Sequence, residues 1–277
     1  MVIGFRELLE ERRARGAAAG AFTCYTLTTA VGVLRAAEVE RAPVILVVSE
    51  ASYTAPEGRL LLAALAAAAE RSAVSACLQL DHVADPATIA RALEDGAGAV
   101  MADGSRLPYE ANAALVREAR ALAGHRAGVE AELGHIEGGE DVAAATAAAA
   151  LTDPDEAARY SEETGADCIA VSIGNVHGHY AAPPALDWVR LERIRELVDV
   201  PLALHGASGL PDTDLRRAVA AGICKVNVNT ELRERLFAEL ERRMPETASG
   251  LRLLELESAL ADAVAEIAAE KLRLLAG

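Results

Sequence analysis

The stretch LQLDHVADPATIARALEDGAGAVMADGS, residues 78–105, carries the pattern that identifies the fold. It opens on a strand-like apolar run, continues through Asp85-Pro86 and Gly96, and reaches a second apolar run at 99–102. An Asp side chain accepts from the free N–H groups of a first helical turn, Pro at the first helical position loses no hydrogen bond, and Gly permits a left-handed exit. The stretch therefore predicts a strand, a helix and a second strand in parallel.

The same unit recurs along the chain. Helix-length amphipathic stretches separate apolar runs at 19–23, 44–48, 76–80, 99–102, 129–133, 168–173, 202–204 and 223–228. Strands with continuous apolar character are typical of sheets that are buried on both faces. Eight units in 277 residues predict an α/β protein, a single (β/α)₈ TIM-barrel domain over residues 1–277, since such barrels take ~250 residues.

Composition and charge limit the function classes. Apolar residues make up 52% of the chain and aromatic residues only 3%, so a core of Ala, Leu, Val and Ile is expected and disorder is excluded. The 27 basic and 42 acidic residues give a net charge of −15, which argues against nucleic acid or an anionic membrane as partner. An anionic substrate must then be held by local groups.

No segment predicts a membrane span or a secretory signal. The longest apolar run, 60–69, is about half the ~20 residues that a bilayer needs, and predicts a buried helix. Residues 1–15 mix both signs of charge and contain no uninterrupted apolar region, so a cytoplasmic protein is expected. Reduced thiols are expected at four widely spaced cysteines, Cys24, Cys77, Cys168 and Cys224.

Polar side chains follow most of the predicted strands, and in a (β/α)₈ barrel they meet at one mouth. The candidates are Asp81, His82, Asp103, Glu130, Glu132, the runs 175–178 and 205–208, and the run 227–230. Three histidines on different strands, His82, His177 and His205, predict a catalytic zinc site with an open fourth position. His125 and His135 are expected to be ordinary surface or core residues.

One connection departs from the pattern. Residues 134–153 are too long for a usual strand-to-helix loop and contain Gly138 and Gly139. A plain surface excursion is one interpretation. A mobile lid that carries catalytic groups over the mouth of the barrel is the other.

Several motifs together resemble the class II, zinc-dependent ketose-bisphosphate aldolases, which act on fructose or tagatose bisphosphate. They are the stretch 78–105, VEAELG at 129–134, GGED at 138–141, IGNVHGHY at 173–180, LHGASGLP at 204–211 and KVNVNTEL at 225–232. The resemblance runs in order from about residue 42 to about residue 232. The first 40 residues and the carboxy-terminal helices match only loosely.

The resemblance implies a mechanism that uses the same three histidines that the strand pattern predicts as a zinc site. His82, His177 and His205 would hold Zn²⁺, which polarises the ketone of dihydroxyacetone phosphate. Asp81 would exchange a proton with the C4 hydroxyl. Glu140, in the loop, would handle the proton on the enediolate carbon.

The resemblance also implies further sites. Asp103 and Glu132 correspond to a second divalent metal position, although each could instead orient a histidine, and a monovalent cation is a further cofactor that the family allows. Backbone N–H groups and small side chains would bind phosphate at Gly178, Gly206, Ala207, Ser208, Asn227, Val228, Asn229 and Thr230, with Ser49 near the substrate. Gly178 and Gly206 could equally be turn formers, and Asn229 a helix cap.

Two departures from the family pattern leave the sugar open. Thr23 follows Ala21-Phe22 where many members have Asn, and Val47 stands where members often have Gln. Both changes fall where the sugar beyond the reacting bond would lie. Fructose 1,6-bisphosphate is the leading substrate, with glyceraldehyde 3-phosphate as second product, and tagatose bisphosphate or another ketose phosphate is the alternative.

Two other function classes compete with an aldolase. A barrel metal hydrolase usually has an H-x-H pair after the first strand, and AFTCYT at 21–26 contains none. A non-catalytic paralogue, serving as a subunit of a partner aldolase, should have lost ligands that this chain keeps. The family resemblance suggests a homodimer or homotetramer, and the amphipathic stretch 251–275 is expected to pack against the outside of the barrel.

Overall fold

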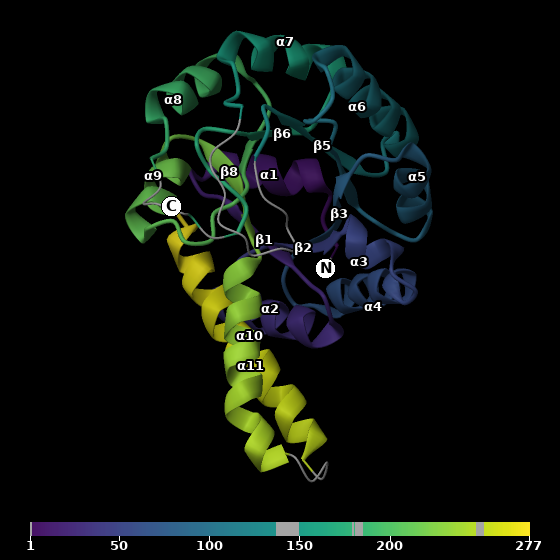
Figure 1. Cartoon of the computed structure of the whole chain (residues 1–277), viewed down its shortest axis with the longest axis vertical. Coiled ribbons are helices and arrows are strands. Elements are labelled where there is room, and N and C mark those ends of the chain that lie inside the picture. Colours follow the sequence, from purple (N-terminus) through teal and green to yellow (C-terminus); the bar gives the residue numbers. More distant parts are fainter. Residues whose placement is uncertain (1, 137–149, 179, 181–184, 248–251) are drawn as a thin grey trace.

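A closed barrel of parallel strands forms the centre of the molecule (Figure 1). The computed structural model describes residues 2–136, 150–178, 180, 185–247 and 252–277. The strands neighbour one another in sequence order and the first pairs with the last: β1 (Ala19–Thr23), β2 (Val44–Ser49), β3 (Ala76–Val83), β4 (Ala99–Ala102), β5 (Gly128–Leu133), β6 (Cys168–Val171), β7 (Leu202–Leu204) and β8 (Ile223–Val228). The predicted (β/α)₈ barrel is confirmed.

Helices surround the barrel and follow its strands in turn. Their bounds are α1 (Phe5–Ala14), α2 (Leu27–Glu40), α3 (Glu50–Thr54), α4 (Gly58–Arg71), α5 (Pro86–Glu94), α6 (Tyr109–Ala123), α7 (Pro154–Thr164), α8 (Trp188–Leu197), α9 (Asp212–Ala220), α10 (Thr230–Thr247) and α11 (Leu253–Leu274). The predicted helix start at Asp85 is confirmed, and Asp153 begins α7 in the same way; the carboxylate of each accepts from two backbone N–H groups.

Most of the strand side chains in the apolar part of the barrel interior are small. Alternate residues of the strands point inward, among them Ala19, Ala21, Cys77, Ala99, Cys168, Ala170 and Ala203. Phe5, Leu8 and Leu9 of α1 join this inner cluster, and a Cβ at Gly128 would lie only 2.5 Å from the Phe5 ring. Helix α1 therefore closes the end of the barrel where the strands begin, and leaves the other end for the polar residues.

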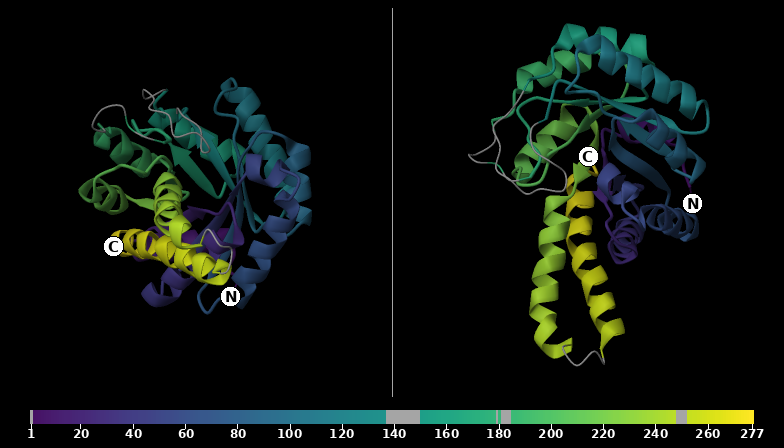
Figure 2. Two further views of the ribbon diagram at one scale, coloured as in Figure 1. Left: turned by 60° about the horizontal axis from the view of Figure 1, so that its bottom comes forward. Right: turned by 45° about the vertical axis from the view of Figure 1, so that its right-hand side comes forward.

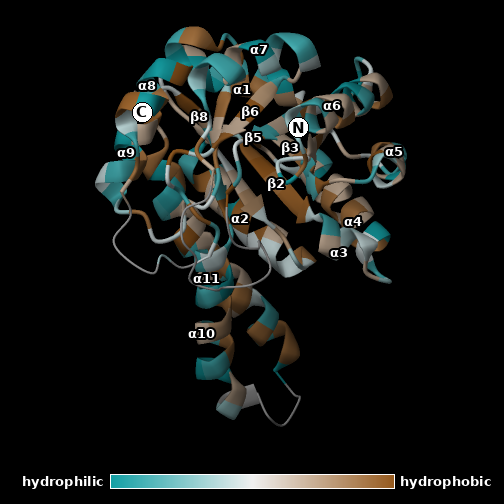
Figure 3. Cartoon of the chain, turned by 45° about the horizontal axis from the view of Figure 1, so that its top comes forward, coloured by the Kyte–Doolittle hydropathy of each residue, from teal (hydrophilic) through white to brown (hydrophobic). Residues whose placement is uncertain are grey.

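A second apolar layer lies between the strands and the outer helices. Figure 3 shows the hydrophobic colour concentrated on the strands, while much of the outer surface of α7, α8 and α9 is hydrophilic. The scarcity of aromatic residues is met by packing Ala, Val, Leu and Ile throughout this layer. All four cysteines are buried and free, as expected.

The structure corrects three details of the expected elements. Strand β3 continues to Val83, so Asp81 and His82 lie within it, and β6 ends at Val171 rather than at residue 173. The run 60–69 forms an amphipathic part of α4 instead of a buried helix, since Leu60 is 73% exposed while Leu62 and Leu65 are buried. Helical periodicity turns a continuous apolar run so that some of its side chains face water.

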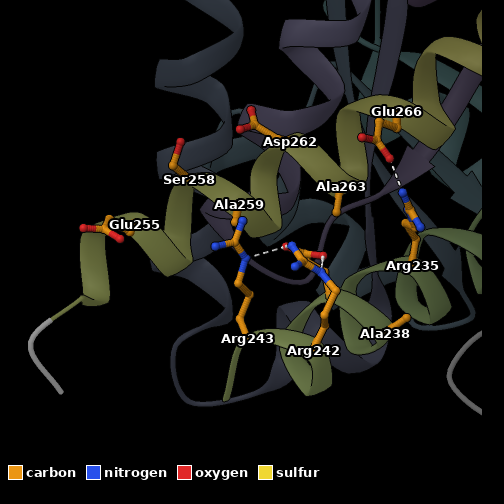
Figure 4. Close-up of a pocket in the computed structure, with 11 residues that line it drawn as sticks. Arg235, Ala238, Arg242, Arg243, Glu255, Ser258, Ala259, Asp262, Ala263 and Glu266 are labelled. Carbon is orange, nitrogen blue, oxygen red and sulfur yellow. Dashed lines mark hydrogen bonds and ion pairs between the residues drawn. The ribbon is translucent and has the colours of Figure 1, made fainter. Parts of the chain in front are cut away.

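Helices α10 and α11 form a hairpin that projects from the barrel (Figure 2). The second half of α11 packs on α2 through Ala261, Val264 and their neighbours, where a Cβ at Gly32 would meet the Ala261 carbonyl oxygen at 2.5 Å. A charged groove separates the two helices, and Arg235 pairs there with Glu266 (Figure 4). The expected packing of the last helix on the barrel exterior holds for this second half, whereas Leu253 and Leu254 are exposed.

Among the described residues, no helix is both long enough and apolar enough to cross a membrane.

Candidate active site

The polar residues at the open end of the barrel share the inward orientation of the apolar residues below them. On β3 the inward positions are Cys77, Gln79 and Asp81, and on β8 they are Lys225 and Asn227. Their period of two along each strand is the period of the pleat. The barrel therefore changes from apolar to polar as its strands approach their carboxyl ends, where Glu130, Glu132 and His205 also face the interior.

His82 reaches the same cavity by a different route. The alternation would place it on the opposite face from Asp81, but its backbone has a φ of 52° and the pairing of β3 with β4 shifts register between Leu80 and Val83. A non-glycine residue in the left-handed region is uncommon and is often found at functional sites. This irregularity brings two consecutive side chains to one site.

Three histidine rings meet at the mouth of the barrel. The ring centroids of His82 and His177 are 5.1 Å apart, those of His82 and His205 4.9 Å, and those of His177 and His205 5.8 Å. One ring nitrogen of each lies within 4.8 Å of the others, and Nε2 of His82 is 3.1 Å from Nδ1 of His205. The predicted histidine set is thus brought together, and it could hold a metal ion.

The carboxylate of Glu130 orients His205. Nε2 of His205 donates to Oε1 of Glu130 at 2.8 Å, so the lone pair of the neutral ring is on Nδ1, the nitrogen that faces His82. Burial, reinforced by the nearby Lys225, lowers the pKa of His205 and favours that neutral form. Burial also acts on Glu130, but Lys225 and His205 outweigh it and hold the pKa of this carboxyl well below its usual range.

Carboxylates surround His82. Nδ1 of His82 donates to Oδ2 of Asp103 at 2.8 Å, and Oε2 of Glu132 lies 3.9 Å from the same nitrogen. Burial disfavours charge on the ring, but Asp81, Asp103 and Glu132 raise the pKa of His82 well above its usual value. Burial and the negative charge of Asp103 raise the pKa of Glu132 to about 7. Asp103 and Glu132 thus form, with His82, a second group that could hold a cation.

One carboxylate oxygen of Asp81 accepts a hydrogen bond and the other has no partner among the described residues. Nδ2 of Asn227 donates to Oδ2 of Asp81 at 3.0 Å. The other oxygen, Oδ1, is buried and has no hydrogen-bond partner among the described residues. A buried carboxylate oxygen without a partner is costly unless something else binds it. Oδ1 of Asp81 is therefore available to accept a further hydrogen bond beside the histidines.

Seven of the residues predicted to bind phosphate line one small cavity together with His177: Gly178, Gly206, Ala207, Ser208, Asn227, Asn229 and Thr230. Val228 is absent from its lining and its side chain is buried in the outer apolar core. Gly206 has a φ of 62°, and a Cβ there would lie 2.1 Å from the carbonyl oxygen of Val176. Its turn and this close approach both require glycine.

Substituting Gly206 by Ala is expected to destabilise the protein more than the matched change at Gly16. Both glycines have a φ of 62°, but a Cβ at Gly16 meets nothing within 4 Å. Gly16→Ala should cost about 1–2 kcal/mol from the left-handed backbone alone. Gly206→Ala should cost about 1–3 kcal/mol more because of the clash. Urea unfolding of the two variants measures the difference, and equal losses would contradict the close approach.

The other predicted residues have separate outcomes. Ser49 ends β2 at the edge of the site and its hydroxyl accepts from the backbone N–H of Ser52, which caps α3. Glu140 lies outside the described residues, as does most of the predicted lid. His125 is exposed, as expected, and His135 contacts the Ser105 hydroxyl at 3.1 Å.

Sequence reasoning missed the residues that support the site from below. Lys225 and Gln79 were given no role and Glu130 was only noted, yet all three are completely buried and joined by hydrogen bonds. Charged or amide side chains inside otherwise apolar strand runs, LQL and ICKVNV, were the available signal. Asn175 was noted only within its motif, but its side chain ties the segment after β6 to the His205 carbonyl at 3.0 Å.

Comparison with known proteins gives a family match over nearly the whole chain. The family model described as fructose-bisphosphate aldolase class-II matches residues 4–277. The structure of the YdjI aldolase from Escherichia coli K12 is 31% identical, with a TM-score of 0.88 over 99% of this chain and 97% of that one. A protein from Coccidioides immitis, crystallised as a candidate fructose-1,6-bisphosphate aldolase, is also 31% identical, with a TM-score of 0.88 over 97% and 94% of the two chains.

A more distant structure shares the fold. The fructose-bisphosphate aldolase from Campylobacter jejuni is 20% identical and has a TM-score of 0.79 over 99% of this chain and 95% of that one.

Proposed function

This chain belongs to the class II fructose-bisphosphate aldolase family, and on that premise we propose that it reversibly cleaves a ketose 1,6-bisphosphate into dihydroxyacetone phosphate and glyceraldehyde 3-phosphate. Fructose 1,6-bisphosphate is the leading substrate. The observation that carries the proposal is the meeting of three histidine nitrogens within 4.8 Å of one another, beside the buried carboxylate of Asp81. A non-catalytic paralogue would have no need to keep this set.

The residues fit a catalytic zinc ion. Two nitrogens on one tetrahedral zinc are expected roughly 3.3 Å apart for bond lengths of about 2.0–2.1 Å, and Nε2 of His82 and Nδ1 of His205 are 3.1 Å apart. The second ring nitrogen of His82 donates to Asp103 and that of His205 donates to Glu130, and ligand histidines usually make such a hydrogen bond. We propose His82, His177 and His205 as the ligands. Zinc, when bound, would polarise the ketone and stabilise the negative charge of the enediolate.

Asp81 is proposed to move the proton at the C4 hydroxyl. Its Oδ2 is anchored by Asn227, and Oδ1 is the atom free to accept from the substrate. In cleavage Asp81 takes the hydroxyl proton as the C3–C4 bond breaks, and in condensation it returns the proton to the aldehyde oxygen. Glu140, on the family resemblance alone, is proposed to exchange the proton on the enediolate carbon.

Phosphate is proposed to bind in the cavity between the ends of β6, β7 and β8. Gly178 and Gly206 have positive φ and expose backbone to the cavity, while Ser208 and Thr230 add hydroxyls. A site of this kind needs no basic surface, which suits a chain of net charge −15. Ser49 and the backbone of Val228 are proposed to contribute at the edges of the substrate site.

A panel of ketose mono- and bisphosphates, epimeric at C4, tests the substrate. The Thr23 hydroxyl is buried without a hydrogen-bond partner among the described residues. This hydroxyl, which replaces the Asn of many family members, is proposed to contact the part of the sugar beyond the reacting bond. We expect one C4 epimer to release dihydroxyacetone phosphate with at least about tenfold higher kcat/KM, because a site that bonds a hydroxyl discriminates its position. Chelation should abolish cleavage and zinc should restore it. Undiminished cleavage by the metal-free protein would overturn the proposal.

Zinc binding is expected to strengthen as pH rises and to release protons. In the metal-free protein the pKa of His82 is raised, so near neutral pH the ring holds a proton that zinc must displace. Affinity should therefore increase with pH until pH exceeds the pKa of His82. Calorimetric titration at pH 7 in two buffers of different ionisation enthalpy measures the release, expected at about one proton per zinc. Identical heats in both buffers would show that no proton leaves.

The remaining proposals concern cofactors, assembly and location. We propose Asp103 and Glu132 as the carboxylates of a second divalent metal site, and the family also allows a monovalent cation. The protein is proposed to be a single domain, to act in the cytoplasm, where four free thiols stay reduced, and to assemble as a homodimer or homotetramer. Sedimentation of the purified protein distinguishes the two assemblies.

A further inference from the structure

Lysine is rare in this chain, and one of its two lysines is buried in the barrel. Lys225 and Lys271 are the only lysines among 27 basic residues, and arginine occupies every other basic position. Lys225 lies on β8 with no exposed surface. A buried ammonium is costly unless it is paired and hydrogen-bonded, and its compact charge fits where a guanidinium fork does not. The charge of Lys225 must therefore be balanced by the groups around it.

Lys225 contacts two groups that lie below the histidines. Its Nζ is 2.8 Å from Oε2 of Glu130 and 2.6 Å from Oδ1 of Asn227. Gln79 donates to the same Glu130 oxygen at 2.6 Å. Nε2 of His205 donates to the other oxygen of Glu130 at 2.8 Å. The lysine thus links, through Glu130, the histidine that follows β7 to an amide on its own strand.

The direction of these hydrogen bonds orients the site. An ammonium can only donate, so it holds the oxygen of the Asn227 amide and turns the nitrogen away from itself. That nitrogen lies 3.0 Å from Oδ2 of Asp81 and 3.3 Å from Nδ1 of His205. A reversed amide would present its oxygen to the Asp81 carboxylate, which repels it. The same ammonium lies 2.8 Å from Oε2 of Glu130, and the other oxygen of this carboxylate accepts from His205.

We propose that Lys225 is a positioning residue that fixes the Asn227 amide and the Glu130 carboxylate, and through them the orientation of Asp81 and the metal-binding nitrogen of His205. The significance of Asp81 and His205 rests on the proposed aldolase function. The contacts themselves involve no substrate. Lys225 acts only through these neighbours.

Three variants of the full-length protein test the inference. Lys225→Met removes the ammonium and keeps the length of the side chain. The double variant Lys225→Met, Glu130→Gln also neutralises the carboxylate that the first change leaves unpaired. Lys271→Met is the matched control, because Lys271 is 7% exposed and paired with Glu231 at 2.7 Å but belongs to α11. Zinc affinity by chelator competition, the visible spectrum of the cobalt-substituted protein, kcat and KM are measured for each.

The inference predicts about a 10- to 100-fold loss of zinc affinity and of kcat in Lys225→Met, with little change in KM and an altered cobalt spectrum. The double variant should regain thermal stability, but its zinc affinity and its kcat should each remain at least about tenfold below those of the unaltered protein. Lys271→Met should lower only the melting temperature. If Lys225→Met does not fold, the zinc affinity, cobalt spectrum and kcat of the double variant test the inference. A double variant with unchanged affinity, spectrum and kcat would show that Lys225 and Glu130 merely balance each other's charge.

Zinc affinity and the cobalt spectrum keep this inference separate from the proposed activity. If the unaltered protein binds zinc but cleaves no ketose bisphosphate, the proposed function fails, while the effect of Lys225→Met on metal binding still decides the role of Lys225.

Discussion

His205→Ala is expected to remove bound zinc and to lower the rate of ketose bisphosphate cleavage by at least about 10³-fold. Nδ1 of His205 is one of three nitrogens within 4.8 Å of one another, and alanine leaves only two. A metal that polarises a carbonyl contributes several kcal/mol of transition-state stabilisation, and about 4 kcal/mol corresponds to 10³-fold in rate. Metal analysis of the purified protein and steady-state release of dihydroxyacetone phosphate measure the two effects.

His125→Ala is the control for this change. His125 is the exposed residue before Arg126, in the connection between α6 and β5, and among the described residues it belongs to none of the groups that could hold a metal. Its loss should leave both zinc content and rate unchanged. Wild-type zinc content and rate in His205→Ala would rule out the three-histidine site.

Asp81→Asn is expected to separate the two proton transfers of the reaction. Asparagine keeps the shape of Asp81 and can still accept from Asn227, so the variant should fold and bind zinc. It cannot take the C4 hydroxyl proton, and cleavage should fall by about 10²–10⁴-fold, the usual contribution of a general base. Exchange of the dihydroxyacetone phosphate proton with deuterated solvent does not need this group and should persist, as followed by NMR.

Asp155→Asn, at an exposed position in the first turn of α7, is the matched change away from the site. It should preserve both cleavage and exchange. If Asp81→Asn lost exchange and cleavage in parallel while retaining zinc, a single proton-transfer role for Asp81 would be wrong.

Much of the fold could be predicted because its signals are local. Asp85-Pro86 and Gly96 mark a helix through capping and backbone conformation, which depend on a few neighbouring residues. Continuous apolar runs identify strands that are buried on both faces. The run 60–69 misled because apolar character alone does not say which side of a helix faces water.

The candidate site was predictable where residues follow a strand and less so where side chains lie inside the barrel. His177 and His205 follow β6 and β7, and the structure brings them beside His82. Lys225 and Gln79 received no role, because their partners lie on strands far away in sequence. Contacts between such strands follow from barrel closure and register, which a linear pattern does not contain.

By itself, the sequence determined the (β/α)₈ barrel, the end of the barrel at which the polar residues gather and the three histidines that meet there. Only the tertiary structure decided how those residues are aimed. Because His82 has a positive φ, the consecutive side chains of Asp81 and His82 both point into the same cavity. Lys225 orients Asn227 and Glu130 from inside the barrel. Both depend on the closed sheet, because the register between strands sets which side chains face each other at its centre.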